Sequence, residues 1–329
     1  MNPTNGYFIV SLDFELFWGV FDVKKLKNYK ENLENVRVVI PRLLELADAY
    51  NVKLSFATIG FLFAKNKQEL LEFIPELKPS YKNKKFNPYL LIDGLGNSEK
   101  DDPYHYANSL IQLIKENENH EIACHTFSHY YVNEAGQTLL QFEADLKAAI
   151  AIAKKNKVEL KSIVFPRNQI NESCLEICSK YGITAFRGTE RHWMFDTQNT
   201  KKLESPAHKA FRLIDTYVNL SGYNTYKVSN IQDYSGVLNI ASSKFFRPYT
   251  KGLGFLEPLR ISRIKKGMTY AAKNKEVYHI WWHPHNFGSH TNANFKNLEQ
   301  LFKHYRYLNQ TYGFNNDSMS HFAEQVKKG

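Results

Sequence analysis

The sequence predicts an α/β fold built on a parallel sheet or barrel, and three observations lead to this prediction. Segments with a strand pattern and segments with a helix pattern alternate along most of the 329 residues. The first predicted strand, residues 7–12, is an almost continuous apolar run, which is typical of a strand covered on both faces. Polar residues repeatedly follow the predicted strands, and in parallel barrels the carboxyl ends of the strands build the active site.

The elements of the first part of the chain follow from hydrophobic periodicity. Val36, Ile40 and Leu43 recur at helical spacing and predict a helix over residues 34–50. Pro41 either kinks this helix or restarts it with the proline in a first turn. The other elements predicted here are the strands 52–58, 161–165 and 183–186 and the helices 60–73, 104–117, 134–155 and 173–181.

The second part of the chain continues the alternation. A strand over residues 237–241, a basic helix over 258–273, a strand over 277–282 and helices over 293–312 and 318–327 are predicted. Two stretches, residues 75–103 and 187–235, show no clear periodicity and are rich in polar and turn-forming residues. Long loops in compact domains are usually functional or poorly ordered. We therefore expect one domain over residues 1–329, with pocket-forming insertions in these two stretches.

Charge and composition narrow the class of partner. The net charge is +10, mostly from scattered lysines, which are typical of a solvated surface. A functional explanation is an anionic substrate or an acidic membrane surface. Arginine is scarce relative to lysine, and no basic run is interleaved with aromatic residues, so nucleic acid is not expected as a partner.

Cysteine usage and the terminus predict the compartment. There are three cysteines, and one of them, Cys124, lies in an apolar strand, so a reducing compartment is expected rather than a disulfide framework. No basic segment followed by a long apolar one opens the chain, and no run approaches the ~20 apolar residues of a membrane span. We therefore expect a cytoplasmic protein.

A histidine pair is the most specific local motif. The apolar run before His125 predicts a buried strand that passes into a first helical turn, which would place His125 and His129 on one face. Two imidazoles at this spacing can converge on one metal ion. The alternative is a pair of surface histidines at the end of a strand.

Other polar residues follow other predicted strands. Asp13 and Glu15 end the first strand, and residues two apart on a strand face the same side. Arg167, Arg187 and His283 each follow a later strand. Separately, each has a simpler explanation: a helix N-cap for the carboxylates, a surface arginine or a loop histidine. Jointly, they favour one polar site at the carboxyl ends of the strands.

These motifs together resemble the polysaccharide deacetylases of the NodB-homology type, carbohydrate esterase family four. The resemblance runs from Tyr7 to His285 and implies a distorted (β/α)7-type barrel. Its counterparts here are Asp13-Phe14-Glu15, His125-Thr126-Phe127-Ser128-His129, Phe165-Pro166-Arg167, the segment 187–193 and Ile280-Trp281-Trp282-His283. Two departures are visible: Phe14 separates carboxylates that are adjacent in the family, and Arg167 follows its proline instead of preceding it.

The resemblance implies roles for these residues. Glu15, His125 and His129 would bind a divalent metal, with zinc expected, in a two-histidine, one-carboxylate set. Asp13 would be the catalytic base and His283 the acid that protonates the leaving amine. Which carboxylate binds the metal stays open, although the family order favours Glu15. Arg167 would pair with Asp13 and keep it ionised.

Substrate contacts are also implied. Trp18 and Trp193 would stack on a sugar face, although an aromatic residue is more often simply packed. Arg187 and His285 would contact the substrate, and His285 is the alternative acid if His283 is not the acid.

The expected function is metal-dependent removal of an N-acetyl group from a sugar. A nucleotide- or lipid-linked intermediate of surface polysaccharide (lipopolysaccharide) biosynthesis suits a cytoplasmic enzyme. The basic helix, with Arg260, Arg263, Lys265 and Lys266, would suit a phosphate-bearing substrate or peripheral contact with the inner membrane face. Two alternatives remain: a metal-independent cyclic amide or ureide hydrolase of the allantoinase-like kind, and a non-catalytic glycan-binding relative. The two histidines disfavour the first, and the complete set of acid, base and ligands disfavours the second.

Overall fold

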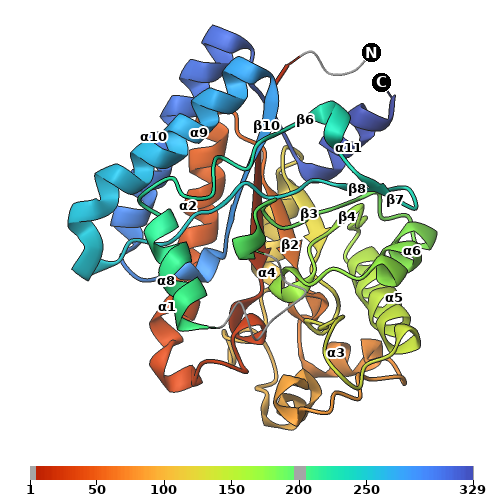
Figure 1. Cartoon of the computed structure of the whole chain (residues 1–329). Helices are drawn as coiled ribbons and strands as arrows, with labels where there is room; N and C mark the ends of the chain where they lie inside the picture. Colours follow the sequence, from red (N-terminus) through yellow and green to blue (C-terminus); the bar gives the residue numbers. More distant parts are fainter. Residues whose placement is uncertain (1–4, 196–204, 329) are drawn as a thin grey trace.

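A curled, largely parallel sheet forms the centre of the computed structural model, which describes residues 5–195 and 205–328 (Figure 1). The sheet order is β6-β10-β1-β2-β3-β4-β5-β8-β7, with β9 beside β10 and β11 beside β1. The strands are β1 Tyr7–Phe14, β2 Ser55–Thr58, β3 Glu121–Cys124, β4 Ser162–Ile163, β5 Ala185–Phe186, β6 Tyr226–Lys227, β7 Asp233–Tyr234, β8 Val237–Asn239, β9 Lys244–Phe245, β10 Glu276–Trp282 and β11 Asn315–Asp317. The predicted α/β fold is confirmed.

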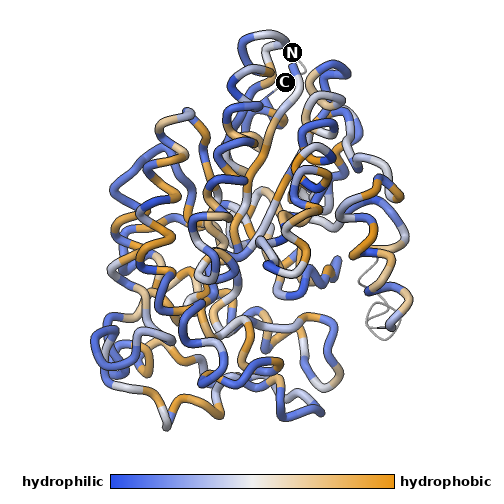
Figure 2. Tube along the Cα trace, turned by 90° about the vertical axis from the view of Figure 1, so that its left-hand side faces the viewer, coloured by the Kyte–Doolittle hydropathy of each residue, from blue (hydrophilic) through white to orange (hydrophobic). Residues whose placement is uncertain are grey.

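Helices cover the outside of this sheet. They are α1 Lys30–Glu34, α2 Val36–Ala49, α3 Lys67–Phe73, α4 Asn108–Glu116, α5 Leu139–Lys155, α6 Glu172–Lys180, α8 Pro206–Asp215, α9 Glu257–Asn274, α10 Thr291–Tyr312 and α11 Met319–Lys328. Along the helical turns the trace alternates between hydrophilic and hydrophobic segments, as expected of amphipathic helices on a core (Figure 2). None of the described helices is long and apolar enough to cross a membrane.

The side chains of the apolar first strand, β1, point alternately to the two faces of the sheet. Phe8, Val10 and Leu12 belong to the core cluster under the helices, whereas Ile9 belongs to a second cluster inside the curled sheet. This inner cluster includes small residues such as Ala57 of β2. Because the side chains of a strand alternate between its faces, burial on both sides requires the almost unbroken apolar run seen in the sequence.

The segment 240–246 joins the two ends of the curled sheet. Its first part bonds to the β5 side, since Ile240 N donates to the carbonyl oxygen of Phe186 at 2.8 Å. Its later part bonds to β10, since Ser243 N donates to the carbonyl oxygen of His279 at 2.7 Å and Phe246 N to that of Trp281 at 2.8 Å. The ring of strands is therefore closed by an irregular segment, which distorts the barrel.

The amino ends of the strands are covered by α11. Phe322 packs its ring against Tyr7 at the start of β1, with 4.6 Å between centroids. Met319 N donates to Ser55 Oγ at the start of β2, and Ser320 N donates to Glu121 at the start of β3. The inner cluster is thus closed at this end of the barrel.

Several predicted elements differ in detail from the structure. The predicted helix 34–50 is α2, which is preceded by the short helix α1; Pro41 lies inside α2, so the restart at Pro41 is wrong. The predicted helix 60–73 is a 3-10 turn, Gly60–Phe63, followed by α3. The stretch 75–103 holds two 3-10 turns. The stretch 187–235 contains α8, β6 and β7, and its residues 196–204 lie outside the described part of the chain.

The segment after β3 is a loop and not the helical turn that the sequence predicted. Thr126 and His129 adopt φ values of 63° and 59°, in the left-handed region that non-glycine residues seldom occupy. Asp145 of α5 anchors this loop. Its carboxylate accepts hydrogen bonds from Phe127 N at 2.7 Å, from Ser128 N at 3.1 Å and from the Ser128 hydroxyl. Such strain persists only where the surroundings over-determine it.

Replacing Asp145 with alanine should therefore loosen this loop. Two buried N–H groups would lose their acceptor, and each such loss costs roughly 1–3 kcal/mol. Burial raises the pKa of Asp145 to about 6, so its carboxyl contributes most below its unfolded pKa of ~3.9, and part of that contribution is lost as the pH rises through about 6. Urea unfolding of Asp145→Ala and wild type at pH 4 and pH 7 measures both effects.

The matched control is Lys147→Ala, an exposed position on the same helix. We expect this control to unfold like wild type. Equal unfolding free energies for Asp145→Ala and wild type at both pH values would contradict the anchoring role of Asp145.

Candidate active site

The carboxyl ends of four strands bring the polar residues together. Asp13 lies near the end of β1, and Glu15 follows it. His125 follows β3, Arg187 follows β5 and His283 follows β10. All except His283 are buried, and the His283 side chain is 24% exposed. The sequence correctly indicated one shared polar site at this end of the barrel.

Glu15, His125 and His129 form a compact group of three donor atoms. Glu15 Oε2 lies 3.2 Å from His125 Nε2 and 3.3 Å from His129 Nε2, and the donor atoms of the three residues all lie within 4.8 Å of one another. In the described part of the chain these residues form a group able to hold a metal ion.

The hydrogen bonding of His125 shows that this group suits a cation. Its Nδ1 lies 2.7 Å from the carbonyl oxygen of Val164, which only accepts, so Nδ1 carries the hydrogen. In the tautomer with no hydrogen on Nε2, the lone pair of this nitrogen points at a carboxylate oxygen of Glu15. Two acceptors facing each other at 3.2 Å need a cation or an added proton between them. Burial lowers the pKa of His129, which favours the neutral imidazole that binds metals.

A glycine makes room for the Glu15 side chain. A Cβ atom added at Gly19 would lie 1.9 Å from Glu15 Cδ and 2.1 Å from its Oε1. Gly19 ends the 3-10 turn Leu16–Gly19 that directly follows Glu15. The carboxylate therefore occupies space that only glycine leaves open.

Asp13 forms a buried, two-pronged ion pair with Arg187. Arg187 Nη1 and Nη2 donate to the two carboxylate oxygens at 2.7 and 2.8 Å, and the guanidinium lies 4.1 Å from the ring centroid of Trp281. Burial alone would raise the pKa of Asp13, but the charge and the hydrogen bonds of Arg187 bring it below its ordinary value. Asp13 is thus held in its ionised form.

Two residues that the sequence did not single out orient Arg187. Ser11 Oγ accepts from Arg187 Nη1 at 3.0 Å and lies 2.8 Å from His279 Nε2. His279 Nδ1 lies 3.0 Å from the carbonyl oxygen of Ile240, and burial lowers the pKa of His279 to about 3. Nε2 of the neutral ring therefore accepts a hydrogen bond from the Ser11 hydroxyl. Polar residues inside otherwise apolar strands were the available signal in the sequence.

His283 faces both carboxylates. Its Nε2 lies 3.5 Å from Glu15 Oε1 and 3.7 Å from Asp13 Oδ2. His285 is buried and stacks on His283, with 5.1 Å between ring centroids, and burial lowers its pKa to about 3. His285 thus packs against His283, and its contact with the substrate stays a prediction.

Three further predictions need correction. Arg167 pairs with Asp22 and, at 3.5 Å, with Glu134, instead of with Asp13. Arg187 takes the place beside Asp13, so it is a buried positioning residue rather than a substrate contact. Trp18 is fully buried and donates to the carbonyl oxygen of His105 at 2.8 Å, so it cannot stack on a sugar.

Trp193 lies at the surface, with 58% exposure. Its ring neighbours include His208 and Phe211 of α8. Its stacking on a sugar stays a prediction.

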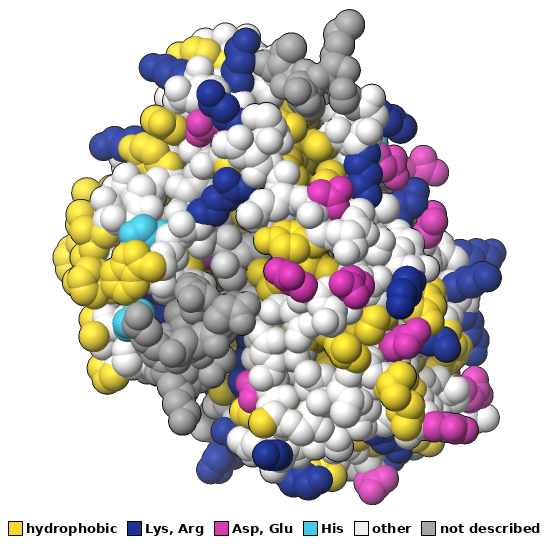
Figure 3. Space-filling model, turned by 45° about the vertical axis from the view of Figure 1, so that its right-hand side comes forward, with side chains coloured by type: hydrophobic (Ala, Val, Ile, Leu, Met, Phe, Trp, Pro, Cys, Tyr) yellow, Lys and Arg dark blue, Asp and Glu magenta, His cyan; other side chains and the backbone are white. Residues whose placement is uncertain are grey.

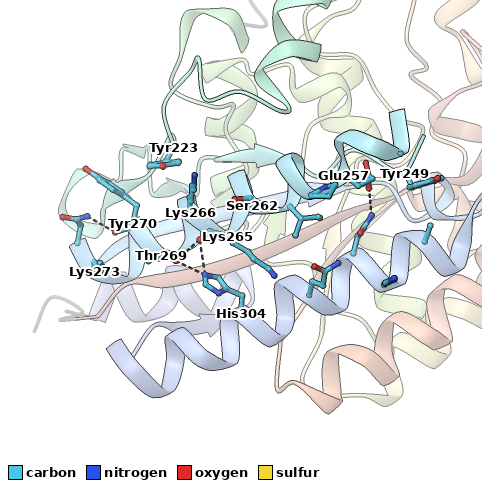
Figure 4. Close-up of a pocket in the computed structure, with 18 residues that line it drawn as sticks. Tyr223, Tyr249, Glu257, Ser262, Lys265, Lys266, Thr269, Tyr270, Lys273 and His304 are labelled. Atoms are coloured by element: carbon cyan, nitrogen blue, oxygen red, sulfur yellow. Dashed lines mark hydrogen bonds between the residues drawn. The ribbon is translucent and has the colours of Figure 1, made fainter. Parts of the chain in front are cut away.

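A large cavity lies away from this site. It has a volume of about 980 Å³ and runs between α9 and α10 (Figure 4). Lys265, Lys266 and Lys273 line it, and none of the residues grouped around Asp13 and Glu15 does. The two arginines of the same helix are buried in ion pairs, Arg260 with Glu257 and Arg263 with Asp215, so the predicted basic surface consists of lysines only.

Comparisons with known proteins agree with this fold. A protein assigned to the polysaccharide deacetylases, from Mycobacterium smegmatis, superposes with a TM-score of 0.60 at 13% identity, over 99% of this chain and 92% of its own. The α-amylase AmyC from Thermotoga maritima superposes with a TM-score of 0.53 at 10% identity, over 98% of this chain and 75% of its own. At such identities the likeness concerns the fold alone. A search of curated proteins found no match.

The sequence itself matches one family model. Residues 34–186 match the model described as polysaccharide deacetylase, and this range includes His125 and His129. Asp13, Glu15 and His283 lie outside the matched range, and the structure brings them to the two histidines. Over residues 34–186 the chain is therefore similar to the polysaccharide deacetylases.

Proposed function

We propose that this protein is a metal-dependent deacetylase that removes the N-acetyl group of a sugar. One observation carries the proposal: the two-histidine, one-carboxylate group lies directly beside the Asp13–Arg187 pair and His283. Glu15, His125 and His129 would hold a divalent ion, with zinc our choice for this donor set. A metal-independent ureide hydrolase has no need of this group.

Each side chain then has a defined task. A bound divalent ion would lower the pKa of a water molecule and polarise the acetyl carbonyl. Asp13, kept ionised by Arg187, accepts the proton of the attacking water on a carboxylate oxygen. His283 is the partly exposed group of the site, and it protonates the amine nitrogen as the C–N bond breaks.

We further propose a phosphate-bearing substrate, a nucleotide- or lipid-linked sugar used in building a surface polysaccharide. The net charge of +10 favours an anionic partner. The three cysteines are free and buried, which suits a cytoplasmic location.

Peripheral contact with the inner membrane face is part of the same proposal. Hydrophobic side chains gather along one edge of the molecule (Figure 3). On α8 and just after it, Phe211, Ile214 and Val218 are 46%, 51% and 53% exposed. Exposed apolar residues near lysines are typical of proteins that bind an anionic bilayer surface.

Metal analysis of the purified protein tests the main proposal. Wild type should hold one divalent ion and deacetylate N-acetylated sugars, and a chelator should abolish this activity. His125→Ala should lose both the ion and the activity. His290→Asn is the matched control, since His290 is exposed and asparagine tolerates its positive φ. Full activity after complete removal of metal would disprove the proposal.

Gly19→Ala tests the position of Glu15 without touching a ligand. The new methyl group would displace the carboxylate, so we expect a loss of metal affinity of about 10–100-fold. Unfolding free energy should change little, because a flexible side chain can move. Gly94→Ala, where an added Cβ meets no atom within 4 Å, should bind metal like wild type. Competition with a chromogenic chelator measures the dissociation constants, and an unchanged constant for Gly19→Ala would show that Glu15 is not a ligand.

Arg187→Met should raise the pKa of Asp13, because burial would remain while the compensating charge is lost. The acidic limb of the pH–rate profile should therefore move to higher pH. Leaving one partner of a buried pair alone also costs about 3–5 kcal/mol of stability. The double variant Asp13→Asn/Arg187→Met should unfold with a higher free energy than Arg187→Met. An unshifted acidic limb would exclude Asp13 as the base.

A further inference from the structure

A second cavity borders the active site and is lined by positive charge. Its volume is about 280 Å³. The lining includes four cationic side chains, one carboxylate and an aromatic wall: Arg167, Arg212, Lys244, Arg247, Glu190 and Trp281. Pockets that enclose a whole small ligand usually measure about 300–1,000 Å³, so this cavity suits one part of a substrate.

Trp281 connects this cavity to the reaction centre. Its ring carries the Arg187 guanidinium at 4.1 Å from the centroid and lies 5.6 Å from the ring of His283. Asn168, which also lines the cavity, accepts from Arg187 at 2.8 Å. A substrate with its acetamido group beside Asp13 and His283 would therefore reach the cavity with an adjoining group.

Two of the four cations in this lining already have acidic partners. Arg167 pairs with Asp22, and Lys244 shares the buried Asp215 with Arg263. Glu190 accepts from Trp281 Nε1 at 3.3 Å.

Arg247 differs from them. Within residues 5–195 and 205–328, no carboxylate lies within ion-pair distance of its guanidinium. Arg247 is half-buried, and its charged neighbours are Arg212 and Arg260. Burial and these two like charges lower its pKa. A half-buried guanidinium among other guanidiniums is stabilised by an anion that accepts its planar, two-pronged donors.

We propose that this cavity binds the phosphate or diphosphate group of the substrate, with Arg247 as the binding residue. This inference rests on the deacetylase function proposed above, because the sugar that carries the phosphate must have its acetamido group beside Glu15 and Asp13. Nucleotide-linked and lipid-linked sugars share this chemistry, so the site recognises the phosphate and not its source.

Paired substrates test the proposal in the metal-loaded protein. The same N-acetylated hexosamine is offered as a uridine diphosphate derivative, as a short isoprenyl phosphate derivative and as the neutral methyl glycoside. Arg247→Gln should lower kcat/KM at least tenfold on the phosphate-bearing substrate that the enzyme uses, as expected for a lost charged hydrogen bond. Its kcat/KM on the methyl glycoside should stay within twofold of wild type. Arg191→Gln, at an exposed arginine outside the cavity, should behave like wild type on all three.

Comparison of the two phosphate-bearing substrates identifies the carrier of the sugar. The derivative with the higher kcat/KM in wild type shows whether the carrier is a nucleotide or a lipid. An equal loss on the neutral glycoside and on the phosphate substrates would overturn the proposal, because Arg247 would then support the site and not the phosphate.

A binding measurement separates this inference from the catalytic one. Inorganic pyrophosphate is titrated by calorimetry into His125→Ala, which removes metal chelation as a source of heat, and into His125→Ala/Arg247→Gln. We expect at least tenfold weaker binding in the double variant. If pyrophosphate binding depends on Arg247 but the metal-loaded wild type turns over no N-acetylated sugar, the phosphate subsite is upheld and the deacetylase function is refuted. Equal binding by both proteins would refute the subsite and leave the deacetylase function standing.

Discussion

The burial of two carboxylates at the end of β1 is the constraint on which the rest of the site depends. Asp13 and Glu15 are 4% and 3% exposed, and an isolated charge in such a place is strongly unfavourable. The surrounding residues compensate this cost differently for each carboxylate. Asp13 receives a permanent cation, Arg187, on both oxygens, whereas Glu15 faces two imidazoles that are suited to share a metal ion with it.

This difference suits Asp13 to the proposed role of base and Glu15 to the proposed role of metal ligand. A carboxylate clamped by a guanidinium stays ionised and oriented, yet it keeps lone pairs for a proton. A carboxylate that faces neutral imidazole nitrogens has no proton donor of its own and suits a metal. The order Asp then Glu along the strand, with Phe14 between them, places the two environments side by side, so one short segment supplies both.

Much of the fold and part of the site could be predicted from the sequence, for physical reasons. The two-faced burial of β1 leaves an apolar run, and His125 and His129 are close in sequence because one loop holds them. The sequence could not show which arginine pairs with Asp13, because Arg167 and Arg187 both follow strands. The outcome depends on residues near them in space: Asp22 pairs with Arg167, and Ser11 bonds to Arg187. The left-handed loop at Thr126 was missed for a similar reason: Asp145, which anchors it, lies on α5. Trp18 was predicted to stack on a sugar because the residues around it in the sequence do not show that Phe61, which is distant in the sequence, packs against its ring.

Because α11 covers the amino ends of the strands, it limits where substrate can enter and where products can leave. With Phe322 and Met319 closing that end, the interior offers no second passage there. Under the proposed reaction, the sugar enters from the carboxyl ends of the strands, and both acetate and the free amine leave the same way. Acetate, formed deepest against Glu15 and the histidines, then has the bulky sugar between itself and the solvent. Departure would be sequential, with the deacetylated sugar first and acetate second, so the enzyme would be open to a new substrate only after the smaller product has gone.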